Sequence, residues 1–122
     1  MPSCVHTADD LIEYARKQVD YVLGDNPKGM SYMVGFGDNY PRQLHHRGSS
    51  LPSVWAESEP MFCKGEALTS HYPNVNTHVG AIVGGPNKND EFDDDRQKYE
   101  QSEPATYINA AFVGIVASLL AQ

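Results

Sequence analysis

Apolar residues recur at helical spacing near both ends of the chain. In the first stretch, Thr7 can cap a helix because the acid Asp10 follows three residues later, and the pattern stops at Gly24. The apolar positions between them are Leu11, Ile12, Ala15, Val19, Val22 and Leu23. Their spacing predicts an amphipathic helix from about residue 8 to residue 23.

A second helical pattern begins near Pro104, which suits a first helical turn, and continues to the C-terminus. Its broad apolar face consists of Ile108, Ala111, Phe112, Ile115, Val116, Leu119 and Leu120. Small residues interleave along the same stretch, so the helix is apolar on most sides. We expect it to lie between neighbouring helices rather than on a surface.

The stretch of about eighty residues between these helices contains most of the prolines and glycines. Only short pieces indicate structure: a strand at 30–34, a buried turn at 79–83 and a helical turn at 96–100. Aromatic residues are frequent here, although disordered segments avoid them. Irregular connections longer than about 15 residues are uncommon in compact domains unless they are functional or disordered. We therefore expect long, ordered loops that rest on helices outside this chain.

The charge balance excludes some classes of partner. Sixteen acidic residues against nine basic ones give the 122-residue chain a net charge of -7. No basic cluster offsets the repulsion from phosphate, which argues against nucleic acid. No apolar run approaches the roughly 20 residues that span a bilayer, and the first ten residues lack a signal-peptide pattern. We expect no membrane segment, and no export signal is visible in this sequence.

Two cysteines, Cys4 and Cys63, allow at most one internal disulfide bond. By the chain-entropy estimate such a bond would contribute on the order of 4 kcal/mol. Two free thiols are equally compatible with the sequence, so the pairing stays open.

The residues that could bind a metal do not fall at the spacings of known sites. His45 and His46 are adjacent, so they point to different sides of an extended segment, and no further His or Cys lies at zinc-like spacing. Five of the six residues at 90–95 are acidic, but the run lacks the central glycine and terminal Glu of a calcium-binding helix-loop-helix. Acidic runs of this kind are most often solvated loops. We expect neither a metal nor a cofactor.

Two segments carry candidate chemistry. In residues 31–50, His45, His46 and Arg47 place three hydrogen-bonding groups in succession, which suits sugar hydroxyls. A basic loop that is solvated or paired with the acidic run explains the same pattern. In residues 92–110, Tyr99, Pro104 and Tyr107 surround Glu103 in sequence. They could form a partly desolvated pocket, the setting that a general acid needs.

Taken together, these stretches resemble the C-terminal part of the catalytic domain of glycoside hydrolase family 9, specifically the plant-type endo-1,4-beta-glucanases. The resemblance covers nearly the whole chain. The matching stretches are residues 15–27 (ARKQVDYVLGDNP), 30–37 (MSYMVGFG), 45–52 (HHRGSSLP), 79–86 (VGAIVGGP) and 94–109, which begins DDR and ends EPATYIN. The resemblance implies an all-α fold, the C-terminal portion of an (α/α)6 barrel with long irregular loops. It also implies that residues 1–122 are a C-terminal fragment of one catalytic domain, without an internal domain boundary.

The resemblance also implies roles for individual residues. Glu103 falls on the proton donor of the family, and Asp94 falls on a signature aspartate that positions neighbouring groups. His45 and Arg47 fall on the pair that grips glucose hydroxyls near the scissile bond, and Tyr107 is a further candidate for the same cleft. The implied substrate is a cellulose-type beta-1,4-glucan, whose internal bonds are hydrolysed with inversion, and the intact enzyme is expected outside the cell or in the cell wall.

An inverting glycosidase needs a second carboxylate, which activates water on the opposite face of the sugar. In this family the second carboxylate comes from an Asp-Ala-Gly-Asp motif, which does not occur here, and Asp9 and Asp10 open a helix instead. We therefore expect the isolated chain to be inactive and its exposed helix faces to favour self-association. The alternative is a non-catalytic glucan-binding or interaction protein of the same fold.

One loop, residues 54–60, differs from the usual plant sequence. It contains Trp55, the single tryptophan of the chain. An indole can stack on a glucose ring, although a lone tryptophan in a loop is more often a packing anchor.

Overall fold

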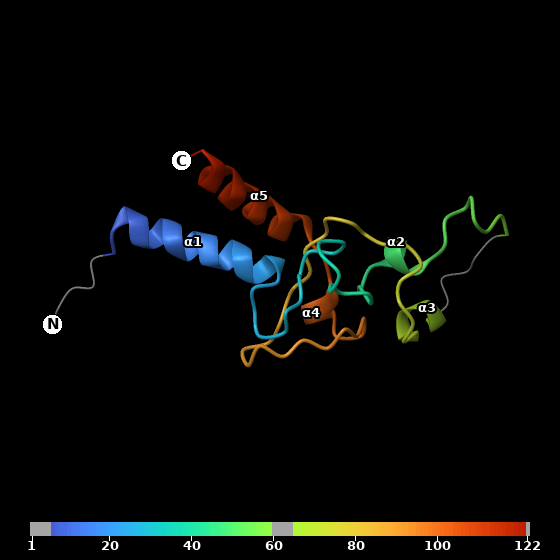
Figure 1. Cartoon of the computed structure of the whole chain (residues 1–122). Coiled ribbons are helices and arrows are strands. Elements are labelled where there is room, and N and C mark those ends of the chain that lie inside the picture. The colour runs from blue at the N-terminus through green and yellow to red at the C-terminus, as the bar shows by residue number, and fades with distance from the viewer. Residues whose placement is uncertain (1–5, 60–64, 122) are drawn as a thin grey trace.

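The computed structural model describes residues 6–59 and 65–121. Within these ranges the regular elements are helices: α1 (Ala8–Leu23), α2 (Arg47–Ser50), α3 (Glu66–Thr69), α4 (Tyr99–Ser102) and α5 (Thr106–Leu120). The two long helices, α1 and α5, lie side by side at one end of the molecule, and the loops with the three short helices extend from the other end (Figure 1). Cys4 and Cys63, whose pairing the sequence left open, lie outside the described residues.

Helix α1 has the bounds that the sequence predicts. The side-chain oxygen of Thr7 accepts a hydrogen bond from the backbone nitrogen of Asp10 at 3.2 Å, and the Asp10 carboxylate accepts one from the Thr7 nitrogen at 2.8 Å. This reciprocal pair satisfies two of the donors left free at a helix start. At the other end Gly24 turns the chain with a φ of 125°, a conformation that residues with a Cβ rarely adopt.

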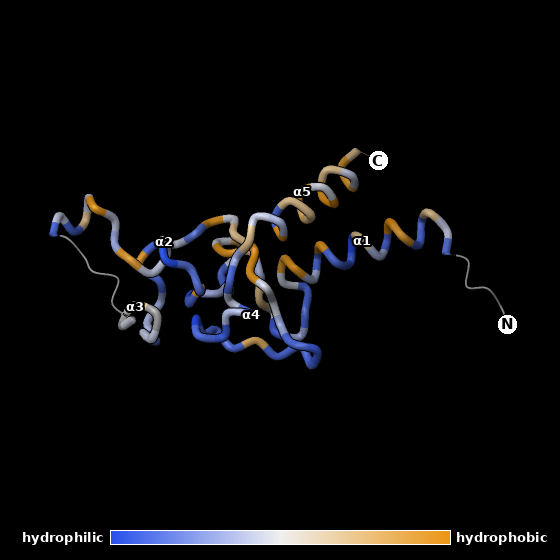
Figure 2. Tube along the Cα trace, turned by 180° about the vertical axis from the view of Figure 1, so that it is seen from behind, coloured by the Kyte–Doolittle hydropathy of each residue, from blue (hydrophilic) through white to orange (hydrophobic). Residues whose placement is uncertain are grey.

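Helix α5 begins at Thr106, two residues later than Pro104, because Pro104 pairs in an isolated bridge with Val83 instead. Figure 2 shows apolar and polar positions alternating in turns along α1, whereas α5 is apolar over most of its length. No residue of α5 is buried, and Val113 and Leu120 are 63% and 83% exposed. Only one side of α5 has a neighbouring helix, α1, within the described part of the chain. Among the described residues, α5 therefore does not lie between neighbouring helices, the position that its sequence predicted.

The core of the described residues lies in the loops rather than between the long helices. Its buried members come from segments far apart in sequence: Tyr32, Val34, Leu44, Ala81, Val83 and Phe92. The backbone nitrogen of Val34 donates to the Ala81 oxygen at 2.9 Å, and that of Val83 donates to the Tyr32 oxygen at 3.1 Å. These contacts hold the two segments together and explain why the loops are ordered.

The strand predicted at 30–34 is wrong. Within residues 30–34, one residue forms an isolated antiparallel bridge, Met33 with Ile82. Glycines on both sides, Gly35 with a φ of 79° and Gly80 with a φ of 83°, turn the chain before a ladder can extend. The turn predicted at 79–83 is buried at 81–83, while Val79 is exposed.

The helical turn predicted at 96–100 forms three residues later, as α4. The Asp95 side chain accepts a hydrogen bond from the Gln97 nitrogen at 2.9 Å. Such a local side-chain contact competes with helix formation and delays the helix start. None of the helices in the described ranges is long and apolar enough to cross a membrane.

Candidate functional site

Asp94 joins the acidic segment to the loop that leads into His45. One oxygen of its carboxylate lies 2.8 Å from the backbone nitrogen of Arg42, and the other lies 2.9 Å from that of Gln43. Hydrogen bonds to an ionised acceptor are stronger than neutral ones. Both oxygens of Asp94 are thus engaged with backbone, an arrangement that suits positioning.

Two contacts fix His45 to residues 96–102, the segment that follows Asp94 in the chain. Its ring atom Nδ1 lies 2.8 Å from the carbonyl oxygen of Arg96, and its backbone nitrogen donates to the Ser102 oxygen at 3.1 Å. The ring centroids of His45 and Tyr99 are 6.0 Å apart. Residues 96–102, which precede Glu103, therefore hold the loop that contains His45 from both of their ends.

Glu103 directly follows the short helix α4 as its C-cap, and its backbone nitrogen donates to the Tyr99 oxygen at 2.9 Å. Its side chain is exposed, and Tyr99 and Tyr107 are themselves 53% and 76% exposed. The expected desolvated pocket around Glu103 is therefore wrong for the described residues. The Glu103 backbone is fixed, and its side chain is open to a partner.

Arg47 and Tyr107 both lie near the start of a helix. Arg47 is the first residue of α2, and Tyr107 lies in the first turn of α5. Both side chains are exposed. Of the five residues predicted for the site, the backbone contacts connect Asp94, His45 and Glu103, while the side chains of Arg47 and Tyr107 extend from their helices into solvent.

Arg96 was not among the predicted site residues, yet it is 2% exposed. Its guanidinium donates to the carbonyl oxygen of Ala67 at 2.7 Å and to that of Tyr72. Burial lowers the pKa of Arg96, while the charges of Asp94 and Asp95 raise it. The signal available in the sequence was one arginine directly after three aspartates, but its burial depends on distant segments.

His46 and His78 form a second group that local patterns did not indicate. Their rings lie edge to face with centroids 4.5 Å apart, and the hydroxyl of the buried Ser49 lies 3.1 Å from Nδ1 of His78 and 3.4 Å from Nδ1 of His46. Burial and the charge of His78 lower the pKa of His46, while the charge of Glu103 raises it.

The same two histidines line a groove at the start of α5. Its volume is about 700 Å³, and its remaining wall includes Pro104, Ala105 and Thr106, the residues that directly follow Glu103. The wall is mostly apolar, so the groove is better suited to packing against another hydrophobic surface than to binding an ion.

The side chains of Asn74 and Asn76 hydrogen-bond to the segment that contains His45 and His46. The Asn74 side chain accepts from the Leu44 nitrogen at 2.7 Å and donates to the Leu44 oxygen at 3.2 Å. Asn76 donates to the carbonyl oxygens of Gly48 and Leu51 at 2.8 and 2.7 Å. These side chains replace the backbone ladder that loops lack, and they fix α2 and Arg47 relative to the core.

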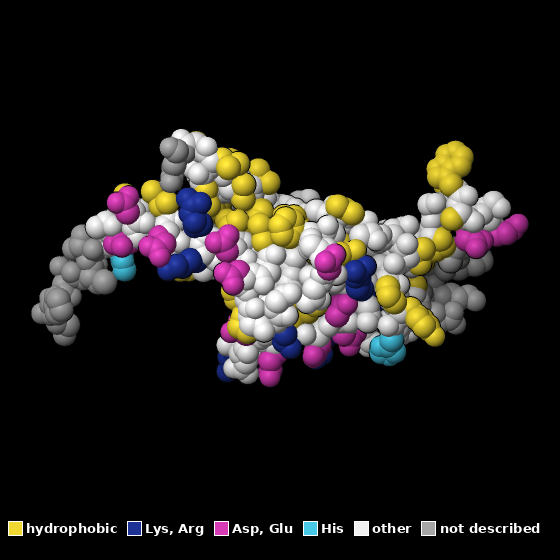
Figure 3. All heavy atoms as spheres, viewed as in Figure 1, with side chains coloured by type: hydrophobic (Ala, Val, Ile, Leu, Met, Phe, Trp, Pro, Cys, Tyr) yellow, Lys and Arg dark blue, Asp and Glu magenta, His cyan; other side chains and the backbone are white. Residues whose placement is uncertain are grey.

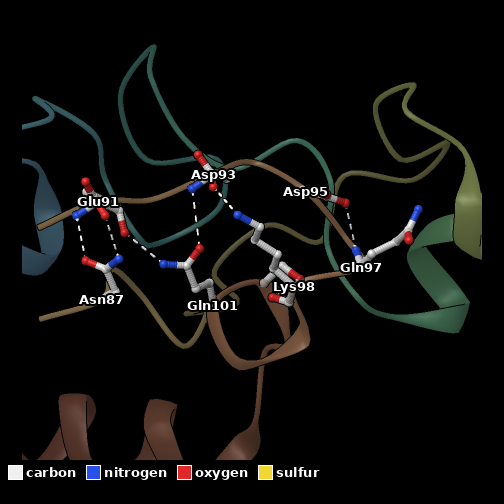
Figure 4. Close-up of polar contacts among 8 residues, drawn as sticks. Asn87, Glu91, Asp93, Asp95, Gln97, Lys98 and Gln101 are labelled. Carbon is white, nitrogen blue, oxygen red and sulfur yellow. Dashed lines mark hydrogen bonds and ion pairs between the residues drawn. The ribbon is translucent and has the colours of Figure 1, made fainter. Parts of the chain in front are cut away.

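The rest of the acidic run contacts nearby polar side chains (Figure 4). Asp93 pairs with Lys98, whose hydrogen bond lowers the pKa of Asp93, and Glu91 accepts from Asn87 at 2.9 Å. The run is thus partly solvated and partly paired with its own neighbours, and Asp94 binds backbone rather than basic side chains. Across the described ranges, no group of three or more His, Cys, Asp or Glu side chains is placed to hold a metal.

Comparison with known proteins relates this arrangement to one family. Residues 3–116 match the sequence profile of Glycosyl hydrolase family 9. Endoglucanase 2 of Persea americana is 59% identical over 118 residues, which are 95% of this chain and 91% of that protein. Endoglucanase 20 of Arabidopsis thaliana is 53% identical over 95% of this chain and 25% of its own length. The cellulase Cel9M of C. cellulolyticum, solved in complex with cellobiose, superposes with a TM-score of 0.74 at 38% identity, over 92% of this chain and 23% of its own.

The chain belongs to glycosyl hydrolase family 9. It spans about a quarter of the length of the Arabidopsis relative and of the solved cellulase. The expected fold class is confirmed: the chain is all-α, a portion of an (α/α)6 barrel with long irregular loops. In a barrel, α5 would have helices on more than one side, which accounts for its apolar composition.

Proposed function

We propose that this chain provides part of the substrate cleft of an endo-1,4-beta-glucanase, and that residues 1–122 belong to one catalytic domain without an internal boundary. In this role Glu103 protonates the leaving oxygen of an internal glucosidic bond, and the bond is hydrolysed with inversion. The names of the family relatives support the activity, and a cellobiose complex of one relative supports a beta-1,4-linked substrate. Such enzymes act on glucan outside the cell or in the cell wall.

The observation that carries the proposal is the hydrogen bond from the His45 nitrogen to the Ser102 oxygen at 3.1 Å. It joins the loop with the sugar-binding candidates to the residue directly before the acid. Because Ser102 is fully buried, the junction is fixed. A glucose ring held by the hydroxyl-binding groups of His45 and Arg47 would then meet the exposed carboxyl of Glu103 in a defined register.

Asp94 supports this geometry without transferring a proton. Its two oxygens hold the backbone nitrogens of Arg42 and Gln43, and so set the direction in which the chain enters His45. Tyr107 lies four residues beyond Glu103 with an exposed ring, which can contact the apolar face of a sugar.

The inverting reaction also needs a carboxylate base, roughly 6.5–9.5 Å from the acid. Asp10, at the start of α1, does not suit this role, because its carboxylate is used in the cap of the helix. We infer that the base comes from the part of the catalytic domain that lies outside these 122 residues, and that this chain alone does not turn over glucan.

A chimera tests the proposal. This chain would replace the matching 118 residues of the Arabidopsis relative, which is 53% identical over that stretch. We expect the chimera to hydrolyse carboxymethylcellulose and its Glu103→Gln variant to lose about 10²–10⁴-fold in rate. Glu100→Gln, which changes an exposed acid on the short helix α4 directly before Glu103, serves as the matched control and should retain activity. Equal activity of the two variants would contradict the role of Glu103.

A further inference from the structure

The contact between His45 and Arg96 determines which nitrogen of the imidazole carries the proton. Nδ1 of His45 lies 2.8 Å from the carbonyl oxygen of Arg96, and a carbonyl oxygen has no hydrogen to give. The hydrogen bond therefore requires that Nδ1 donate. A neutral imidazole carries one proton, so Nε2 is left with its lone pair and can only accept.

The position of that carbonyl depends on the Arg96 side chain. The guanidinium is buried, and it donates to the carbonyl oxygens of Ala67 and Tyr72. Its Nε is also buried, and no acceptor for it exists among the described residues. Burying a cation with an unpaired donor is costly, so Arg96 carries a desolvation penalty at this position. The visible effect of Arg96 is to fix residues 94–96 against residues 67–72.

We infer that Arg96 is a positioning residue: its buried guanidinium fixes the local backbone, and its carbonyl oxygen holds His45 as the Nδ1-protonated tautomer, so that Nε2 is presented as a hydrogen-bond acceptor. The ligand that Nε2 meets, a glucan hydroxyl, rests on the proposed function. The tautomer itself does not.

This tautomer complements the neighbouring Arg47. A guanidinium only donates hydrogen bonds, whereas Nε2 of this tautomer only accepts them. A sugar hydroxyl can accept from one group and donate to the other at the same time. The pair would therefore select a free hydroxyl, and a methyl ether at that position would lose the bond to His45.

The first test measures the tautomer directly in the 122-residue chain without any glucan. Long-range proton–nitrogen NMR spectra would be recorded on the 15N-labelled chain at about pH 8.5, above the usual histidine pKa of roughly 6.5. His45→Gln assigns the signals. We expect a protonated Nδ1 and an unprotonated Nε2 for His45, whereas the exposed His71 should show mainly the Nε2-protonated form of a free imidazole. A protonated Nε2 in His45 overturns the inference.

The second test changes Arg96. Arg96→Met removes the donors to Ala67 and Tyr72 with little change in length, and Arg16→Met changes an exposed arginine of α1 as the matched control. We expect the Nε2-protonated form of His45 to become populated in Arg96→Met and to stay undetected in Arg16→Met. A folded Arg96→Met chain with an unchanged His45 tautomer overturns the role of the side chain. If Arg96→Met does not fold, the same comparison is made with Arg96→Lys, whose ammonium cannot reproduce the planar fork. Because no ligand is present, failure of glucan binding cannot produce either result.

Discussion

The carboxylate of Asp94 lies 2.8 Å from the backbone nitrogen of Arg42, fifty-two residues earlier in the chain. Its second oxygen accepts from the next nitrogen, that of Gln43. An aspartate used in this way acts on the site through the backbone. These two hydrogen bonds give Asp94 a role in the geometry of the loop that contains His45. In the proposed reaction the proton transfer is performed by Glu103.

Replacing Asp94 with asparagine tests the first relationship. The amide keeps one acceptor oxygen but turns an NH2 group towards a backbone N–H, so one donor loses its partner. We expect Asp94→Asn to lower the free energy of unfolding by about 1–3 kcal/mol in urea denaturation. Asp38→Asn, at an exposed position of a neighbouring loop, should change it by less than about 0.5 kcal/mol. Equal effects of the two changes would argue against the backbone contact.

The hydroxyl of Tyr21 donates to the carboxylate of Asp90, which connects α1 to the first residue of the acidic run. This hydrogen bond, with burial and the Asp90 charge, raises the pKa of Tyr21 to about 12. The folded state then holds the phenol proton more tightly than the unfolded chain, whose tyrosines titrate near 10. The stabilisation is complete below about pH 10 and is lost as the pH rises towards 12.

Thermal unfolding at a series of alkaline pH values measures this loss. We expect the melting temperature of the wild type to fall between about pH 10 and 12, and Tyr21→Phe to show a smaller fall over the same range. Tyr14→Phe removes an exposed tyrosine of the same helix and should leave the wild-type slope. If Tyr21→Phe and Tyr14→Phe behave alike, the contact with Asp90 does not contribute.

Apolar side chains lie exposed over α1 and α5 (Figure 3). They include Leu11, Val113 and Leu120, and a shallow groove of about 370 Å³ runs between the two helices. Since exposed apolar surface favours association, we expect the chain to self-associate with rising concentration in sedimentation experiments. Val113→Lys with Leu120→Glu should shift the chain towards the monomer.

The control for this experiment is Trp55→Ser. Trp55 is 96% exposed and lies between α2 and α3 in the chain, outside α1 and α5, so its loss should change association less than the double variant does. A monomer at all concentrations would contradict the expectation of self-association. The same exposure shows that Trp55 is not a packing anchor among the described residues, which was the more common interpretation of a lone loop tryptophan.

Local patterns predicted the parts of the fold that depend on local contacts. The bounds of α1 follow from the cap at Thr7 and the turn at Gly24, which involve residues close in sequence. The start of α5 was placed two residues early because the bridge between Pro104 and Val83 is a long-range contact. The predicted strand was wrong for a similar reason, since its partner segment is ended by a glycine turn.

The site was predicted through the family resemblance, and its supporting residues were not. Arg96, His78 and Ser49 act through contacts with segments about twenty-four to twenty-nine residues away, which no local spacing indicates. In the part of the chain that the structure describes, Glu103 has no enclosing pocket, because Tyr99 and Tyr107 are exposed. Any enclosure of Glu103 therefore has to come from residues outside the described ranges.

In the chimera with the Arabidopsis relative, the dependence of rate on the leaving group distinguishes Glu103 as a general acid from Glu103 as a structural or binding residue. A glucan bond needs protonation of its leaving oxygen, whereas a dinitrophenyl cellotrioside has a leaving group that departs without it. We predict that Glu103→Gln lowers kcat/KM on cellopentaose by about 10²–10⁴-fold and on the dinitrophenyl substrate far less. An equal loss on both substrates would contradict proton donation by Glu103, because it would assign Glu103 a structural or binding role instead.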